Sequence, residues 1–440
     1  MNRNNLQQFK KYVLPTVLAM VGSSCYVLVD TLFVTHINEN ALAALNIVLP
    51  IYSVLIAFGA FIAVGASTYY SILMARGEKR QGSVFYTHAM IVGMGVSIVI
   101  AVVMMLNKYQ VAEFMGANEE TMQLCIDYMN AYIPLSPFIV LQHLISAFIR
   151  NDGDPKLASA SGLAGSLFNL TFDYFFIFTL DMGMFGAALA TGLSPFVGVV
   201  ICIPYFVKKR NQFHLISCKP SLEVMKDIGK LGLPTLIQGA SSGVVMLAFN
   251  RQLLAIGGNL AVTAYGIIMN VSVVIQYIMM GIAEGVQPLL SSSYGGKKYK
   301  NIKEYAKMSC FSIIVVATLG MAIALLGGNL IIAVFDPRHD DMLRAMTKAG
   351  MIIYFTGLYA HGIIAFLAIF FTSIETPLPS TVISILKTGI VITPLVMILP
   401  HFMGLAGVWA SYPASEILIM AVGLIFFFLK SVYKKQFPDF

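Results

Sequence analysis

The chain consists of long runs of apolar residues that are separated by short polar stretches. Most of these runs exceed the roughly 20 apolar residues that a helix needs to cross a bilayer. Strands of a membrane barrel would show alternating apolar and polar residues, so the continuous runs predict helices. Twelve segments are predicted, at residues 11–34, 46–74, 83–106, 122–148, 156–180, 185–207, 228–255, 260–292, 302–333, 342–372, 378–400 and 403–430.

The composition agrees with this pattern. The 440 residues are 58% hydrophobic and 11% charged, whereas soluble domains carry about 25% charged residues. No polar stretch between the runs is long enough for a soluble domain, and the first run is too long for the core of a cleavable signal peptide. The sequence therefore predicts an all-α polytopic membrane protein.

The positive charges predict an orientation in the membrane. If the N-terminus is cytoplasmic, 22 of the 28 Lys and Arg residues fall in cytoplasmic segments, 4 in outer loops and 2 within apolar runs. Such an excess is typical of cytoplasmic loops, so both termini are expected in the cytoplasm of a cell that holds the protein in its plasma or inner membrane. The net charge of +7 is interpreted as this topology signal, and no nucleic-acid partner is expected.

The chain also contains an internal repeat. LPT at residues 14–16 recurs at residues 233–235, and GMFG at residues 183–186 corresponds to GLAG at residues 404–407. Each half holds six segments, so both halves enter the membrane from the same side. This pattern predicts two six-helix bundles related by pseudo-two-fold symmetry about an axis along the membrane normal, which is a transporter design.

The repeat also predicts a domain division. The N-terminal bundle is expected at residues 1–207, a basic cytoplasmic linker at 208–227 and the C-terminal bundle at 228–440. Because the duplication supplies a complete internal cleft, the chain is expected to act as a monomer.

One carboxylate lies within the first apolar run. Asp30 is part of the sequence VDTLFV, and no other charged residue follows Lys11 in that run. A carboxylate at such a depth costs several kcal/mol unless it faces protein, water or an ion. Asp30 is therefore predicted to belong to an intramembrane cation or proton site; the alternative is that it lies near the outer end of the helix and only anchors it.

The fifth and sixth segments supply partners for this carboxylate. Asn169 and Asp173 are four residues apart and share one helical face, and Thr191 lies early in the following antiparallel segment. Oxygen ligands of this kind suit Na+, and two neighbouring carboxylates also suit a proton because both cannot stay ionised at low cost. The alternative is that Asn169 and Thr191 only form helix–helix or backbone hydrogen bonds.

The second half lacks this arrangement. Asp30 aligns near Asn250, and the adjacent Arg251 is expected to extend toward the outer interface. Lys387 is the other basic residue within a run. The carboxylates Glu375 and Glu416 are weaker candidates for a functional role.

Glu284 is a further carboxylate in an apolar run, one helical turn before Gln287 and Pro288. It is a candidate contact for a cationic substrate, with partnering to a neighbouring residue as the alternative. Flexible methionines and flat aromatics tolerate many ligand shapes. The proposed substrate-binding residues are Glu284, Gln287, Met269, Tyr277 and Met280.

Enzyme chemistry finds no support in the motifs. The chain has no phosphate-binding GxxxxGK[ST] and no GxGxxG. The five cysteines and seven histidines show no disulfide or zinc-ligand spacing. A non-enzyme without a cofactor is expected, apart from H+ or Na+ as a coupling ion. The loop RNDGDPK (150–156) is interpreted as an inward turn whose charges lock a cytoplasmic gate.

These motifs resemble one known family. The opening LPT…VDTLFV…ALAALNIVLPI, RNDGDPK after the fourth segment and GVQPLLSSSYG after the eighth are similar to the multidrug and toxic compound extrusion (MATE) transporters, most of all the MepA-type bacterial branch. The resemblance covers about residues 9–430. It implies a cation site at Asp30, Asn169, Asp173 and Thr191, which agrees with the argument from burial. Other members place coupling acids in the seventh and tenth helices, and this chain departs from that pattern.

The resemblance implies export of bulky, often cationic, amphipathic compounds by an H+- or Na+-coupled antiporter that alternates access. The alternative is a flippase for lipids or lipid-linked saccharides, since related two-bundle transporters share the design. Such proteins often have a strongly cationic cleft, whereas Arg251 and Lys387 are the basic residues assigned to the runs. A membrane-embedded enzyme or a receptor is a third interpretation, without a supporting motif.

Overall fold

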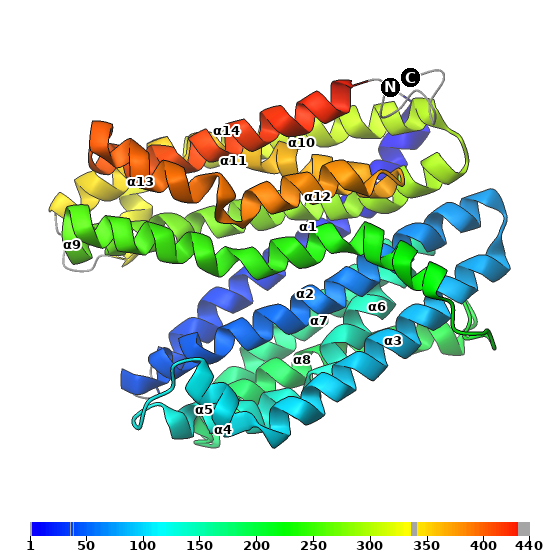
Figure 1. Ribbon diagram of the computed structural model, residues 1–440, viewed down its shortest axis with the longest axis horizontal. Coiled ribbons are helices and arrows are strands. Elements are labelled where there is room, and N and C mark those ends of the chain that lie inside the picture. The colour runs from blue at the N-terminus through cyan, green and yellow to red at the C-terminus, as the bar shows by residue number, and fades with distance from the viewer. Residues whose placement is uncertain (1, 36, 38, 336–340, 430–440) are drawn as a thin grey trace. The chain divides into compact units, whose positions relative to one another are not determined.

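The computed structural model describes residues 2–35, 37, 39–335 and 341–429, and this part of the chain is helical almost throughout, without strands (Figure 1). Helices occupy all twelve predicted segments, so the all-α prediction is confirmed. The first half contains α1 (Arg3–Thr35), α2 (Glu39–Arg76), α3 (Lys79–Leu106), α4 (Lys108–Phe114), α5 (Met122–Tyr132), η1 (Ile133–Leu135), α6 (Pro137–Asn151), α7 (Pro155–Tyr174), η2 (Phe175–Thr179) and α8 (Gly183–Val207). The second half contains α9 (Leu222–Gly295), α10 (Tyr299–Phe335), α11 (Asp341–Ser373), α12 (Pro377–Ile385), η3 (Leu386–Ile390), α13 (Ile392–Met403) and α14 (Leu405–Phe428).

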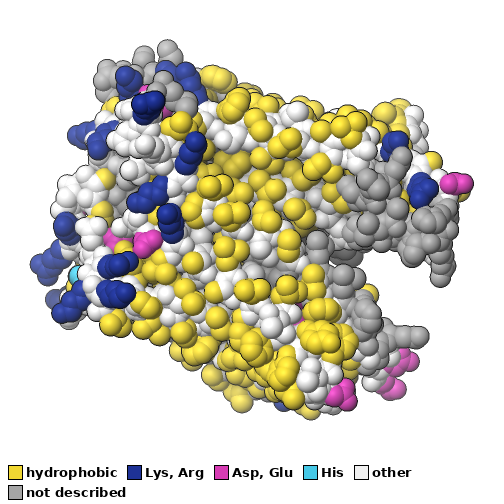
Figure 2. Space-filling model, turned by 180° about the vertical axis from the view of Figure 1, so that it is seen from behind, with side chains coloured by type: hydrophobic (Ala, Val, Ile, Leu, Met, Phe, Trp, Pro, Cys, Tyr) yellow, Lys and Arg dark blue, Asp and Glu magenta, His cyan; other side chains and the backbone are white. Residues whose placement is uncertain are grey.

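By length and hydropathy, seven helices in the described ranges could each cross a membrane, and counting each of two bent helix pairs as one span gives nine. Large apolar side chains stand exposed on these helices and their neighbours, among them Phe114, Leu326 and Phe402. Figure 2 shows hydrophobic side chains over much of one face, with Lys and Arg mostly at its margin. An apolar exterior of this extent needs lipid around it. The protein is therefore a multi-pass membrane protein.

Two predicted segments are bent instead of straight. The fourth turns by 42° between α5 and α6, where Pro134 and Pro137 remove backbone donors. The eleventh turns by 47° between α12 and α13, next to Gly389 at φ 109°. Both η2 and η3 are π-helical turns, which occur often at functional sites. The short α4 lies outside the predicted runs.

The predicted break between segments 228–255 and 260–292 is confirmed. It lies within α9, whose helical backbone is interrupted at Gly258, where φ is 62° and ψ is −160°. Only glycine adopts this conformation at low cost. The 74 residues of α9 thus comprise two helical segments joined by a glycine hinge.

Backbone contacts divide the chain into two compact units. The N-terminal unit comprises Leu14–Gly239 and Ser291–Gly296, and the C-terminal unit comprises Met1–Val13, Ala240–Leu290 and Lys297–Phe440. This contact-based division falls inside α1 and α9, whereas the division predicted from sequence used the linker at 208–227. Arg338 and the basic residues of 430–440, which entered the orientation argument, lie outside the described residues.

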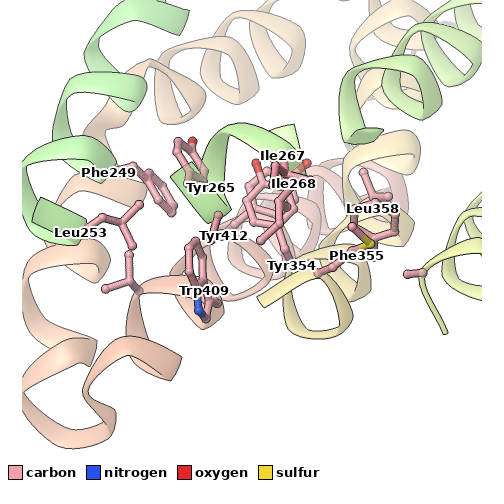
Figure 3. Close-up of a cluster of buried hydrophobic side chains, with 14 of the residues drawn as sticks. Phe249, Leu253, Tyr265, Ile267, Ile268, Tyr354, Phe355, Leu358, Trp409 and Tyr412 are labelled. Carbon is pink, nitrogen blue, oxygen red and sulfur yellow. The ribbon is translucent and has the colours of Figure 1, made fainter. Parts of the chain in front are cut away.

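Each unit has its own buried core. In the C-terminal unit, aromatic rings pack together around Tyr265, Tyr354, Trp409 and Tyr412 (Figure 3). The rings of Tyr354 and Tyr412 are parallel within 3°, with centroids 3.9 Å apart. In the N-terminal unit, Phe148 and Phe213 lie in a second aromatic core that joins α6 to the linker after α8.

Within the N-terminal unit, α2 and the start of α9 cross at backbone contact. A Cβ atom at Gly65 would lie 2.2 Å from the carbonyl oxygen of Ile228, and one at Gly232 would lie 2.1 Å from that of Phe61. Small residues allow helices to approach this closely in a membrane. The two glycines therefore set the distance between these helices.

Gly232→Ala is expected to destabilise the protein by about 1–3 kcal/mol, because the added methyl group forces the two helices apart. The measurement is the thermal unfolding midpoint of the purified protein in detergent. Gly229→Ala is the matched control, since a Cβ atom there meets nothing within 4 Å and alanine favours the helix. An equal midpoint for the two variants would contradict the backbone contact.

Candidate functional site

The structure brings the four predicted cation-site residues together inside the N-terminal unit. α7 carries Asn169 and Asp173 one turn apart, α8 carries Thr191, and α1 carries Asp30. The amide Nδ2 of Asn169 donates a hydrogen bond to Thr191 Oγ1 at 3.3 Å. The carboxyl groups of Asp30 and Asp173 are close enough to interact with each other. Their role as ion ligands remains a prediction.

Small residues allow α7 and α8 to pack with their backbones in close contact. The hydroxyl of Ser161 on α7 donates to the carbonyl oxygen of Gly198 on α8 at 2.9 Å. A Cβ atom at Gly165 would lie 2.9 Å from the carbonyl oxygen of Ser194. This packing of glycine and serine is typical of helix contacts in membranes, and it places Thr191 at the depth of Asn169.

Three acceptor oxygens of the site, both of Asp173 and Oδ1 of Asn169, are buried without a donor among the described residues. Asp173 is 0% exposed and Asn169 is 1% exposed. Apart from Asp30, neither oxygen of Asp173 has a hydrogen-bond partner among the described residues, and Asn169 Oδ1 has none. Buried acceptors without donors are costly, and two carboxyl groups can share a hydrogen bond only if one carries a proton. A proton or a small cation bound at this position would lower that cost.

Aromatic residues flank the site residues along the chain. The stacked rings of Phe168 and Phe172 have centroids 4.1 Å apart, and Phe33 packs edge-on against Phe178 at 5.6 Å. Asp173 lies just before the π-helical turn η2. Burial of Asp173 and Asn169 strengthens electrostatic attraction within the site, because little water screens it. Within the described ranges, no group of three His, Cys, Asp or Glu side chains is placed to hold a metal ion.

The proposed substrate residues all lie on the second part of α9, in the C-terminal unit. Their spacing puts them near one helical face. Gln287 is buried, and the others are half-buried. Met269 packs against the aromatic core, with its sulfur 3.2 Å from the Tyr354 hydroxyl. Arg251 on the same helix is exposed. A substrate contact at Glu284, Gln287, Met269, Tyr277 and Met280 stays a prediction.

The structure adds a buried ionic cluster in the C-terminal unit that the sequence argument missed. Glu416 on α14 lies between His361 of α11 and Lys387 of η3. Its Oε1 atom is 3.2 Å from His361 Nδ1 and 3.6 Å from Lys387 Nζ. The Tyr412 hydroxyl lies 3.1 Å from the same histidine nitrogen.

This ionic cluster left a weak signal in the sequence. His361, Lys387 and Glu416 each stand within an apolar run, where ionisable residues mark functional sites. They belong to three separate segments, so their sequence spacing gives no reason to place them together. Only the packing of α11, α14 and η3 unites them.

The chain is similar to known proteins in both sequence and structure. The family model MatE matches residues 15–175 and 234–399. The "Multidrug export protein MepA" of Staphylococcus haemolyticus is 27% identical over 426 residues, which cover 96% of this chain and 93% of the relative. The protein of the same description from Staphylococcus saprophyticus is 26% identical over 423 residues, 95% of this chain and 93% of the relative.

Solved structures share the fold. A multidrug resistance MATE family transporter of the MOP superfamily, in an outward-facing conformation, superposes with a TM-score of 0.90 at 22% identity, over 95% of this chain and 94% of that one. A mutant of the Vibrio cholerae MATE transporter VcmN gives a TM-score of 0.88 at 18% identity, over 99% of this chain and 98% of that one. At these identities the likeness concerns the two-bundle fold alone.

Proposed function

Because the chain belongs to the MATE family of multidrug efflux transporters, we propose that it is a cation-coupled antiporter driven by H+ or Na+. Its substrates under this proposal are bulky, often cationic, amphipathic compounds that are exported by alternating access. The MepA relatives, described as multidrug export proteins, support this substrate class. Transport of this kind requires no catalysis, cofactor or second subunit.

One observation carries the coupling part of the proposal. Asp30 and Asp173 place two carboxyl groups side by side in an apolar setting, next to an amide oxygen without a donor among the described residues. A cation or proton bound there removes repulsion and fills unmet acceptors, so it favours any conformation that keeps the site closed. Export is then coupled if substrate and cation prefer different conformations.

The alternative, a flippase for lipids or lipid-linked saccharides, receives less support. A basic cleft would be needed to bind a phosphate-bearing headgroup. Lys387 has a carboxylate neighbour, Glu416, and Arg251 is exposed on its helix. The basic residues of the apolar runs therefore offer no concentrated positive charge.

The excess of Lys and Arg in alternate loops supports a cytoplasmic location for both termini.

The proposed activity is tested by dye export. Ethidium uptake is measured in everted membrane vesicles that contain the protein, with an imposed gradient of either H+ or Na+ as the driving force. We expect one of the two gradients to accelerate uptake about tenfold, since coupling free energies of 1–3 kcal/mol correspond to changes of about 5–150-fold. An uptake rate that stays the same when both gradients are dissipated would contradict cation coupling.

A further inference from the structure

The two units differ in how their buried charges are balanced. In the N-terminal unit, Asp30 and Asp173 are two carboxyl groups, and among the described residues neither has an ion-pair partner. In the C-terminal unit, the carboxylate of Glu416 faces the ammonium of Lys387. With its acids ionised and His361 neutral, the first site has a formal charge of −2 and the second has none. Only the first site needs a cation from outside the chain.

The cluster around Glu416 is enclosed by protein. The side chain of Glu416 is 6% exposed, and those of His361 and Lys387 are 17% and 16% exposed. Tyr412, which stacks on Tyr354 (Figure 3), adjoins the cluster through its hydroxyl, 3.1 Å from His361 Nδ1. A lone carboxylate in such surroundings would be very costly, whereas a paired one is tolerated. Lys387 therefore supplies a charge that Glu416 requires.

The histidine completes the cluster without adding net charge. His361 Nδ1 lies 3.2 Å from Glu416 Oε1, 3.4 Å from Lys387 Nζ and 3.1 Å from the Tyr412 hydroxyl. In a neutral ring this nitrogen either donates to Glu416 or accepts from Lys387 or Tyr412. A second positive charge on the ring would leave the enclosed cluster with a net charge. The contacts of His361 are thus compatible with a neutral, internally balanced cluster.

Sequence alignment of the two halves places this cluster beside the counterpart of the cation site. The offset that relates GMFG at 183–186 to GLAG at 404–407 pairs Thr191 with Tyr412. α7 and α12 both begin with proline, and aligning these two prolines pairs Asp173 with Leu395. The second half therefore lacks the Asp173 carboxylate and holds an ion pair in the same group of helices.

We propose that Lys387 is a built-in counter-ion of Glu416 that takes the place of a coupling cation, so that the C-terminal unit completes the transport cycle without binding Na+ or H+. This inference rests on the proposed function, because only a cation-coupled transporter has a coupling ion. It assigns all external ion binding to the N-terminal site, because the fixed ammonium is already present in the other unit.

The test uses the purified full-length protein in detergent, with Asp30→Asn and Asp173→Asn combined to silence the N-terminal site. The thermal unfolding midpoint is measured against NaCl, with choline chloride at equal ionic strength as reference, and against pH without sodium. Lys387→Met, Lys387→Arg, Glu416→Gln alone and Lys387→Met with Glu416→Gln are compared in this background. Lys230→Met is the matched control, since Lys230 forms an exposed ion pair with Asp227.

In the silenced background with Lys387 present, we expect the unfolding midpoint not to depend on sodium. Lys387→Met is expected to lower the midpoint by about 5 °C or more, because a buried charge loses its partner. Added sodium or a lower pH should recover most of this loss, since either one neutralises Glu416. The unfolding midpoints of Lys387→Arg and Lys230→Met should stay close to that of the background. Adding Glu416→Gln to Lys387→Met should remove both the loss in midpoint and its response to cations.

Two results would overturn the inference. One is a cation response of the silenced background that disappears with Glu416→Gln, because Glu416 would then bind an external ion beside Lys387. The other is a Lys387→Met protein without any cation response. If Lys387→Met cannot be purified, the first result still decides the matter. The proposed function is tested separately, by whether wild type shows a cation response that Asp30→Asn with Asp173→Asn removes.

Discussion

Asp173→Asn is expected to reduce gradient-driven dye export by more than about tenfold, and Asp30→Asn by a similar factor. An amide has the size of the carboxyl group but cannot take up a proton or balance a cation, so the site no longer distinguishes the ion-bound from the ion-free state. The loss should approach the full coupling ratio of about 5–150-fold. The measurement is ethidium transport in vesicles with matched expression and an imposed H+ or Na+ gradient.

Asp181→Asn provides the matched control for these substitutions. Asp181 is an exposed residue just after η2, with a positive φ of 52° that asparagine also adopts readily. The Asp181→Asn substitution makes the same chemical change eight residues after Asp173, outside the buried site. Normal gradient dependence in both Asp30→Asn and Asp173→Asn would refute the coupling site, whatever the behaviour of the control.

Asp152→Ala is expected to lower the stability of the N-terminal unit by about 3–5 kcal/mol. The Asp152 carboxylate accepts hydrogen bonds from the hydroxyl of Tyr70, from the hydroxyl of Tyr205 at 2.7 Å and from the backbone N–H of Gln212 at 2.9 Å. Hydrogen bonds to a charged group contribute about 1.5–3 kcal/mol each, and their donors would be left without this acceptor. The measurement is the thermal unfolding midpoint in detergent.

Asp154→Ala separates this effect from the general loss of a charge in the same loop. Asp154 accepts from the N–H of Leu157 as the N-cap of α7, and loss of an N-cap costs about 1 kcal/mol. Similar midpoints for Asp152→Ala and Asp154→Ala would show that the Asp152 contacts contribute little. In the structure Asp152 connects the linker after α8 to α2 and α8. The role of this loop in a cytoplasmic gate stays a prediction.

The sequence by itself determined the class of the fold and predicted the members of a cation site whose role in ion binding stays a prediction. Continuous apolar runs can only be helices in a membrane, because every backbone polar group must be satisfied within its own segment. For the same reason Asp30 and Asp173 stood out, since an ionisable group is costly at that depth. The four-residue spacing of Asn169 and Asp173 determined their common face before any coordinates were known.

The tertiary structure alone decided how residues from different segments meet. Local periodicity says which face of a helix carries a side chain but not which other helix packs against it. For this reason Lys387 and Glu416 appeared in the sequence as unrelated residues, and the structure shows them as one ion pair with His361 beside it. The glycine contacts at Gly65 and Gly232 likewise depend on the crossing of two helices far apart in the chain.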